Sequence, residues 1–351
     1  MLELSGLFQW IHAVASGLFS SLGLSEIFLD IFLMTLAGAA IIVFLALMAL
    51  FLIWWERKVA AHFQDRLGPM MTGWHGWLQT IADAIKLLQK EDIVVANADR
   101  PVHFWAPVVA FASCFMVYAV IPFGKGALAA DLNIGILYIL AITTFTVISI
   151  VMAGWASNNK YALLGGMRSA SQVISYEVPL TLSLMGAVLM AGTLSMGQFV
   201  EAQGPYIWKW YIWPQFLGFA IYLTASTAEL NRTPFDLPEA EQELVAGFNI
   251  EYSGMKFAMF FLAEFLNMFT VGAVATTIFL GGWQPPFPAL SFIPSWLWFL
   301  GKSLFIVFLI MWFKWTYPRV RVDHLLGFAW KVLLPLSFVN LILTAIAVQI
   351  F

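Results

Sequence analysis

Carboxylates gather in one short part of a chain that otherwise carries little charge. Residues 228–248, AELNRTPFDLPEAEQELVAGF, lie between long apolar stretches, although only 11% of all residues are charged. The acids of this region are Glu229, Asp236, Glu239, Glu241 and Glu243, followed by Glu251 and Glu264. Carboxylates crowded in a low-dielectric setting cannot all ionise, so some of their pKa values rise. Such groups are candidate proton carriers near neutral pH, and the alternative is a solvated acidic loop.

Three acids stand inside or beside apolar runs: Glu177, Glu229 and Glu264. A charged side chain at the centre of a membrane helix costs roughly 2.5–3.5 kcal/mol on insertion scales, so such groups are usually paired, neutral or in contact with water. One buried carboxylate could be structural. Three of them, together with the acidic segment, favour a polar path that enters the membrane.

The backbone of the acidic segment is expected to be broken. Proline inside a helix removes a hydrogen bond and clashes with the preceding turn, so Pro234 and Pro238 predict a loop that folds back on itself. Glu229 and Arg232 are three positions apart and could form an ion pair.

The elements that must position these acids are membrane helices. Hydrophobic residues make up 61% of the chain and the mean hydropathy is +0.85, and several apolar runs exceed the roughly 20 residues that a spanning helix needs. These runs are continuous, whereas the strands of a membrane β-barrel alternate. We therefore predict a single all-α polytopic membrane domain over 1–351, with 1–26 as a peripheral N-terminal helix. About eight transmembrane helices are expected, at 31–55, 103–122, 134–155, 173–194, 213–230, 257–281, 296–316 and 326–350.

The basic residues predict the orientation. Of the 17 Lys and Arg residues, all except Lys125, Lys209 and Lys302 fall on one side of this arrangement. The positive-inside rule places that side in the cytoplasm. Both termini are then expected on the outer, periplasmic side, and the acidic segment on the inner side. The cytoplasmic loops are expected at 56–102, 156–172 and 231–256, with a tight turn at Gly165–Gly166.

The first inner loop carries an amphipathic pattern at residues 74–90. Apolar side chains recur at helical spacing at Trp74, Trp77, Leu78, Ile81, Ile85 and Leu88. Polar ones fall on the opposite face at Gln79, Asp83, Lys86 and Lys90. The pattern fits a helix on the membrane surface, or a helix whose Asp and Lys face a cavity or a partner subunit.

The residues that would bind a redox cofactor are missing. The five His residues are scattered, the single Cys114 lies in an apolar run, and neither a phosphate-binding loop nor a dinucleotide fingerprint occurs. We expect this chain by itself to bind no haem, flavin, iron–sulfur cluster or other metal.

Five ordered blocks of sequence resemble one family. They are WERKVAAHFQDRLGP (55–69), GWHGWLQTIADAIKLLQKED (73–92), SNNKYALLGGMRSASQVISYEVPL (157–180), residues 228–261 and PRVRVDHLLGFAWKVLLP (318–335). The chain resembles the quinone-site membrane subunit of respiratory complex I, the proton-pumping NADH:quinone oxidoreductase. His324 departs from the expected Gln, and the first 25 residues have no clear counterpart.

The resemblance implies a quinone chamber that is shared with the redox arm. The residues matching that chamber are Arg57, Arg66, Asp83, Lys86 and Glu91. Those matching an acidic path toward antiporter-like subunits are Glu177, Glu229, Asp236, Glu239, Glu241, Glu243, Glu251 and Glu264. The implied partners are iron–sulfur and quinone-site subunits, small membrane subunits, proton-pumping subunits and lipid, without nucleic acid.

Other functions remain open at this point. Related subunits occur in plastid and cyanobacterial complexes that accept electrons from ferredoxin, and in membrane-bound hydrogenases. A proton-coupled secondary transporter would use the same carboxylates, but its internal repeats are not evident. A purely structural anchor would leave Glu177 and Glu264 unexplained. The expected location is the inner membrane of a bacterium.

Overall fold

Long helices run through the whole molecule. The computed structural model describes residues 6, 12, 15–16, 26–238 and 240–350, so the expected peripheral segment 1–26 falls almost wholly outside the described residues. The helices of the bundle are α2 (Glu26–Phe63), α4 (Arg100–Val117), α5 (Gly135–Ala156), α6 (Lys160–Ala191), α8 (Phe216–Glu229), α10 (Gly254–Phe279), α11 (Ser295–Thr316), the short α12 (Val322–Phe328) and α13 (Leu334–Ile350). A π-helical turn at Ala329–Leu333 joins the last two. Short helices are α3 (Gln79–Gln89), α7 (Met196–Gln203) and α9 (Glu241–Leu244).

The predicted all-α membrane fold is confirmed. Within the described residues, seven helices are long and apolar enough to cross a membrane. The expected span 213–230 corresponds to α8, which has 14 residues and is thus shorter than the roughly 20 of a complete spanning helix. It is nevertheless packed against α6, α10 and α13 inside the bundle.

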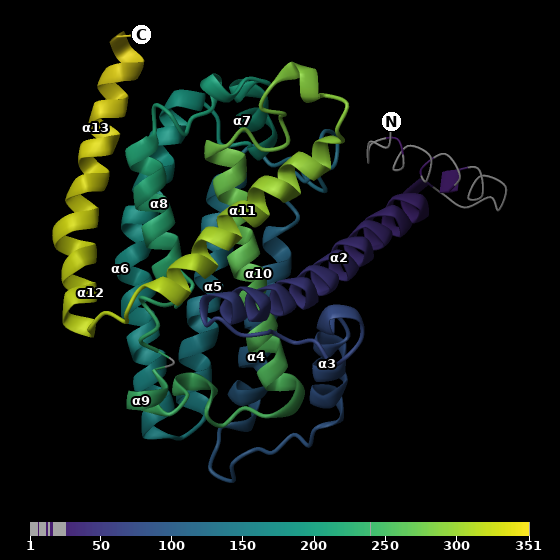
Figure 1. Cartoon of the computed structure of the whole chain (residues 1–351), viewed down its shortest axis with the longest axis vertical. Coiled ribbons are helices and arrows are strands. Elements are labelled where there is room, and N and C mark those ends of the chain that lie inside the picture. Colours follow the sequence, from purple (N-terminus) through teal and green to yellow (C-terminus); the bar gives the residue numbers. More distant parts are fainter. Residues whose placement is uncertain (1–5, 7–11, 13–14, 17–25, 239, 351) are drawn as a thin grey trace.

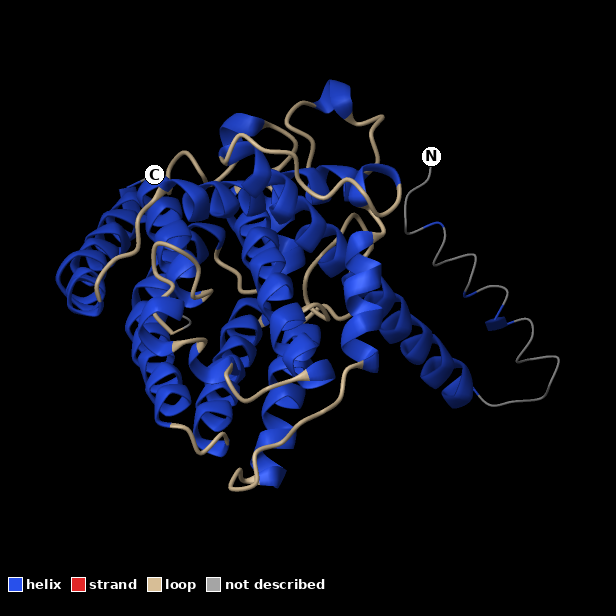
Figure 2. Cartoon of the chain, turned by 60° about the horizontal axis from the view of Figure 1, so that its bottom comes forward, coloured by secondary structure: helices blue, strands red, loops and turns tan. Residues whose placement is uncertain are grey.

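The helix α10 forms the centre of the bundle. It packs against α4, α8 and α11, and it is the most buried of the seven candidate spans in the described part of the chain. It is apolar around nearly its whole circumference, which is typical of a helix enclosed by others. In contrast, α2 and α11 cross the bundle obliquely (Figure 1). The first half of α2, which leads from the N-terminal end, projects away from the bundle (Figures 1 and 2). Ile27 and Met34 on that half are 69% and 74% exposed.

Buried hydrogen bonds attach the last helix, α13, to the rest of the bundle. Gln215, just before α8, donates to Thr344 over 2.6 Å, and Asn340 donates to Gln215 over 3.0 Å. Both contacts are buried, and Asn340 and Thr344 belong to α13, which otherwise lies along one edge of the bundle (Figure 1).

The expected tight turn at Gly165–Gly166 is wrong, because most of the segment 156–172 is helical. Helix α6 begins at Lys160 and continues through both glycines. A Cβ on Gly165 would lie 2.8 Å from Cα of Gly247, and one on Gly166 would lie 3.2 Å from the carbonyl oxygen of Ile150. The glycines therefore let two backbones approach α6 closely, as small residues do in membrane helix packing.

This close packing yields a paired prediction. Gly165→Ala should lower the free energy of unfolding by about 1–3 kcal/mol, because the added methyl group meets backbone atoms that must shift. Gly327→Ala, in α12, adds the same methyl group where nothing lies within 4 Å. Because alanine has the higher helix propensity, this variant should raise the free energy of unfolding by up to about 1 kcal/mol. Thermal unfolding of the detergent-solubilised protein measures both. Equal shifts in the two variants would contradict the packing argument.

Candidate functional site

An open cleft of ≈ 730 Å³ lies between α2, the turn that follows it, α10 and α11. Its charged lining consists of Glu56, Arg57, Arg66, Arg232, Glu264 and Lys314. Its apolar lining includes Ile53, Leu67, Phe257, Phe261, Phe265 and Trp315. This volume falls within the usual range of small-molecule sites, roughly 300–1,000 Å³. A cleft of this kind can hold a molecule that has a polar head and an apolar body.

Four charged side chains form a compact network at the charged end. Nη1 of Arg232 lies 2.8 Å from both carboxylate oxygens of Glu56, and Nε of Arg232 lies 2.7 Å from Glu264. Nζ of Lys314 lies 2.5 Å from Glu56. The side chain of Arg232 is only 3% exposed, and its guanidinium group also lies 4.7 Å from the centre of the Phe265 ring. Two acids and two bases thus balance one another: Arg232 and Glu56 are nearly buried, and Glu264 and Lys314 are about a quarter exposed.

The expected pair between Glu229 and Arg232 is replaced by this network. Helix α8 ends at Glu229, and Asn231 then has a φ of 52°, which turns the chain away from the helical path. The two side chains are therefore not one helical turn apart. Arg232 reaches α2 and α10 instead, and Glu229 faces an inner cavity.

The residues expected to line a chamber are only partly brought together. Arg57 and Arg66 line the cleft. Asp83 on α3 lies 2.7 Å from Arg57, and Lys86 lies 3.9 Å from Asp83. These two residues do not line the cleft and are connected to it only through Arg57. The side chain of Glu91 is exposed and is not part of the lining.

The amphipathic pattern of residues 74–90 is oriented by these contacts. Its polar face turns toward α2, since Gln79 donates to Asp83 and Asp83 accepts from Arg57. Most of its apolar stripe faces outward, with Trp74 at 79% and Leu88 at 64% exposure, whereas Trp77 packs against Trp54 of α2. The stripe is thus available to a membrane surface or to a partner subunit.

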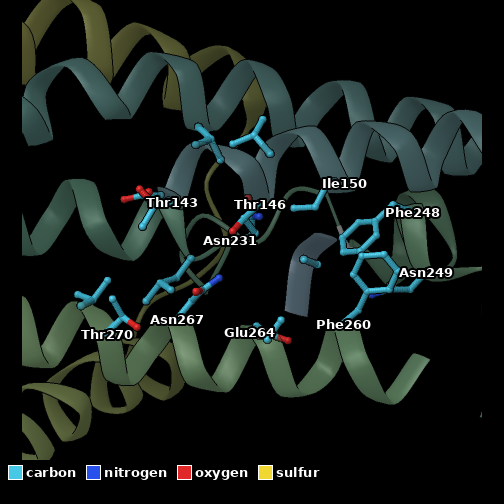
Figure 3. Close-up of a pocket in the computed structure, with 17 residues that line it drawn as sticks. Thr143, Thr146, Ile150, Asn231, Phe248, Asn249, Phe260, Glu264, Asn267 and Thr270 are labelled. Atoms are coloured by element: carbon cyan, nitrogen blue, oxygen red, sulfur yellow. The ribbon is translucent and has the colours of Figure 1, made fainter. Parts of the chain in front are cut away.

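A smaller cavity of ≈ 90 Å³ lies deeper between α5, α8 and α10, with room for a few water molecules. Its polar lining includes Thr143, Thr146, Asn231, Asn249, Glu264, Asn267 and Thr270, shown in Figure 3. Glu264 and Asn249 line both this cavity and the open cleft. The two spaces are therefore neighbours that share a carboxylate.

The polar lining of this cavity continues into a third, smaller space. Glu229, Thr143 and Thr270 line the ≈ 90 Å³ cavity and also a third space of ≈ 30 Å³ beyond it. Glu177 interacts electrostatically with Glu229 and accepts a hydrogen bond of 2.8 Å from Thr144. Glu264 and Glu229 thus follow one another from the cleft into the bundle, and the partly buried Glu177 adjoins Glu229.

The other predicted acids hold the loop in place instead of lining these spaces. Asp236 pairs with Arg319 at 3.0 Å, Glu243 pairs with Arg168 at 2.6 Å, and Glu251 accepts a bond of 2.8 Å from Asn159. Burial raises the pKa of Asp236 above its ordinary value, although Arg319 opposes that rise. Glu239 and the side chain of Glu241 lie outside the part of the chain that the structure describes.

Sequence reasoning missed several members of the site. Glu56, Lys314, Asn249, Asn267, Thr143 and Thr270 were not among the candidates. Asn267 carries a signal that could have been used, because it is an amide in the middle of an apolar run. Among the described residues, His, Cys, Asp and Glu form no group of three that could hold a metal ion.

Comparison with known proteins assigns the family. The profile of a family described as NADH dehydrogenase matches residues 36–345. The chain belongs to this NADH dehydrogenase family. It is 53% identical to the NADH-quinone oxidoreductase H subunit of Brevibacillus brevis over 297 residues, which cover 85% of this chain and 88% of that protein. The corresponding protein of Carboxydothermus hydrogenoformans is 49% identical over 323 residues, covering 92% and 91%. That of Dehalococcoides mccartyi is 51% identical over 308 residues, covering 88% and 84%.

The resemblance seen in the sequence blocks is therefore confirmed for the family. All five blocks fall within the matched residues 36–345. The cleft residues Glu56, Arg57, Arg232, Glu264 and Lys314 fall within the same range. The charged network is thus built from the part of this NADH dehydrogenase family member that it shares with its relatives.

Removal of Arg232 tests the network in this member of the NADH dehydrogenase family. Arg232→Leu should lower the free energy of unfolding by about 3 kcal/mol, because the buried Glu56 keeps only Lys314 as a partner and the partly buried Glu264 loses its ion pair. Arg321→Leu is the matched control: Arg321 pairs with Asp323, and both side chains are more than three-quarters exposed. That pair should contribute almost nothing. Thermal unfolding measures both variants, and a mild effect of Arg232→Leu would contradict the network's role.

Proposed function

We propose that this chain is the quinone-site membrane subunit of a proton-translocating NADH:quinone oxidoreductase. The relatives described above are named as H subunits of NADH-quinone oxidoreductase. The chain would form part of a quinone chamber and would couple quinone reduction to proton translocation. The observation that carries this proposal is that Glu264 lines both the open cleft and the inner cavity.

The open cleft suits the chemistry of a quinone. A quinone has a polar headgroup with two carbonyl oxygens and an apolar tail. Arg57 and Arg66 offer hydrogen-bond donors to the carbonyls, while Phe257, Phe261 and Trp315 offer an apolar surface to the rest of the molecule. The electrons that reduce the quinone would come from the redox centres of partner subunits.

The charged network gives a physical route for coupling. Reduction of a quinone to a quinol brings two electrons and two protons to the headgroup. Negative charge there competes with Glu264 for Arg232, and two unit charges 4 Å apart interact by about 4 kcal/mol at an effective dielectric of 20, compared with about 1 in water. Release of Glu264 from Arg232 would change its affinity for a proton. The change would pass to Glu229 through the water-sized cavities, and from Glu229 to Glu177 through the electrostatic interaction between them.

The location and orientation of the chain in a membrane follow from its charge distribution and its family. We propose that the chain spans the cytoplasmic membrane of a bacterium several times, with both termini on the periplasmic side, since most Lys and Arg residues fall on one side of the spans. The cleft, α3 and the acidic loop would then face the cytoplasm. Redox-arm subunits would cover the cleft, and the acids deeper in the bundle would lead toward proton-pumping membrane subunits.

Narrowing the cleft tests the quinone site. Ala246 lines the cleft and is half-buried, so Ala246→Phe should raise the apparent KM for quinone several-fold by filling space that the substrate needs. Electron transfer from NADH to a water-soluble artificial acceptor should stay unchanged, because that acceptor need not enter the cleft. Ala202→Phe, at an exposed position of α7, is the control. An unaltered KM for quinone in Ala246→Phe would place the substrate elsewhere.

Replacing the inner acids tests the coupling. A positioned acid–base group contributes on the order of 10²-fold or more to proton transfer. Glu229→Gln and Glu264→Gln should therefore lower the number of protons moved per quinone reduced more than they lower assembly of the complex. Reconstituted vesicles with a pH-sensitive dye measure this ratio. Glu201→Gln, at an exposed position, should leave the ratio intact. Normal pumping by both inner variants would refute the proposed proton path.

A further inference from the structure

Two neighbouring threonines of α5 face two carboxylates that lie on different helices. Thr144 donates a hydrogen bond of 2.8 Å to Oε1 of Glu177 on α6. Thr143, shown in Figure 3, lines both inner cavities together with Glu229, the last residue of α8, and forms a side-chain hydrogen bond with it. Consecutive residues of an α-helix point about 100° apart, so one short stretch of α5 reaches both acids.

Both threonine hydroxyl groups also have a second acceptor, the backbone carbonyl of Leu140. Oγ1 of Thr143 and Oγ1 of Thr144 each lie 3.0 Å from that carbonyl oxygen. A hydroxyl group has one hydrogen to donate and two lone pairs that accept. Each hydroxyl hydrogen can therefore be donated either to a carboxylate or to Leu140, and it has a partner in both orientations.

These two orientations match the two protonation states of a carboxyl group. An ionised carboxylate only accepts hydrogen bonds, whereas a protonated carboxyl group also donates one. When Glu177 is ionised, Thr144 donates to it. When Glu177 is protonated, its O–H donates to Oγ1 of Thr144, and the hydrogen of Thr144 turns to Leu140. Neither state leaves a polar group of the pair without a partner, and the same holds for Thr143 with Glu229.

The two acids act on each other as like charges. Both side chains are partly buried, and like charges in such a setting disfavour the state in which both are ionised. A proton that leaves Glu229 and binds Glu177 keeps the total charge of the pair constant and changes only its position. That transfer requires surroundings that stabilise the negative charge at either place.

Other threonines of the spanning helices form the same kind of backbone bond without an acid beside it. Thr35 donates to Ile31 over 2.7 Å, and Thr224 donates to Ala220 over 2.8 Å. Such bonds to the preceding turn are common for threonine in helices. Neither of these two hydroxyl groups donates to a carboxylate within the described residues. The acids therefore distinguish Thr143 and Thr144 from ordinary helical threonines.

We propose that Thr143 and Thr144 are positioning residues that let one proton pass between Glu229 and Glu177. Their hydroxyl groups hold the two carboxyl groups and turn between these and Leu140 as the proton moves. The proton leaves one carboxyl group and binds the other, while each hydroxyl group keeps its own hydrogen. This inference rests on the proposed function, in which these acids carry protons during quinone reduction.

The test uses the complete complex in sealed vesicles, supplied with NADH and a short-chain quinone. Thr143→Val and Thr144→Val keep the shape of the side chain and remove the hydroxyl group. Each should lower the number of protons moved per quinone reduced several-fold, as a pH-sensitive dye measures it. Serine at either position restores the hydroxyl group and should restore the ratio. Thr224→Val, which removes a hydroxyl group without an acid beside it, is the matched control and should leave the ratio intact.

The remaining outcomes separate this inference from the proposed function. Normal proton movement in both valine variants, combined with its loss in Glu229→Gln, would overturn the role of the hydroxyl groups alone. Normal proton movement in Glu229→Gln would overturn the proton path, and this inference with it. A valine variant that loses NADH oxidation with a water-soluble acceptor to the same extent would have a structural defect, which also overturns the positioning role. Should one valine variant fail to assemble, the other decides.

Infrared difference spectra of the complex before and after quinone reduction give an independent measurement. The C=O band of a protonated carboxyl group that disappears in Glu177→Gln belongs to Glu177. Thr144→Val removes a hydrogen bond of that group, so the band should shift, and Thr144→Ser should leave it in place. An unshifted band in Thr144→Val, or no band that depends on Glu177, would overturn the proposal.

Discussion

The buried guanidinium group of Arg232 is the constraint on which the rest of this molecule depends. It joins a carboxylate of α2 to a carboxylate of α10, and Lys314 of α11 balances the remaining charge. Helix α2 is therefore fixed at a single point to α10 and α11, which lie far from it in the sequence. Because these side chains are mostly buried, the energy of each charge depends strongly on its partners. A change in the charge of one residue therefore alters the energy of the others.

The open cleft and the inner cavity meet at one of these charges, Glu264. Glu264 is bound to Arg232 on one side and lines the ≈ 90 Å³ cavity on the other. A substrate that alters the charge in the cleft therefore acts on a carboxylate that already faces the interior. No moving helix is needed for this first step, since the Coulomb interaction itself carries the signal over a few ångströms.

The two ends of the molecule are built for different surroundings. At the cleft end, the polar face of α3 turns inward to Arg57, and paired acids and bases tie the folded-back loop to α6 and to the segment before α12. At the opposite end, aromatic rings and a fully bonded Lys302 form an apolar groove. Glycine contacts such as Gly165 with Gly247 hold the bundle between them at close range.

The sequence by itself determined the helical membrane fold, the family and the presence of acids within apolar helices, because hydropathy, helical periodicity and contiguous motifs are local properties of the chain. It also predicted the broken loop after Glu229, since proline acts on its own neighbours. Only the tertiary structure decided that Arg232 pairs with Glu56, 176 positions away, and that Lys314 reaches the same carboxylate from 258 positions away. Such pairs, like the backbone contact that requires Gly165, arise from how helices pack, and packing brings together residues that share no local pattern.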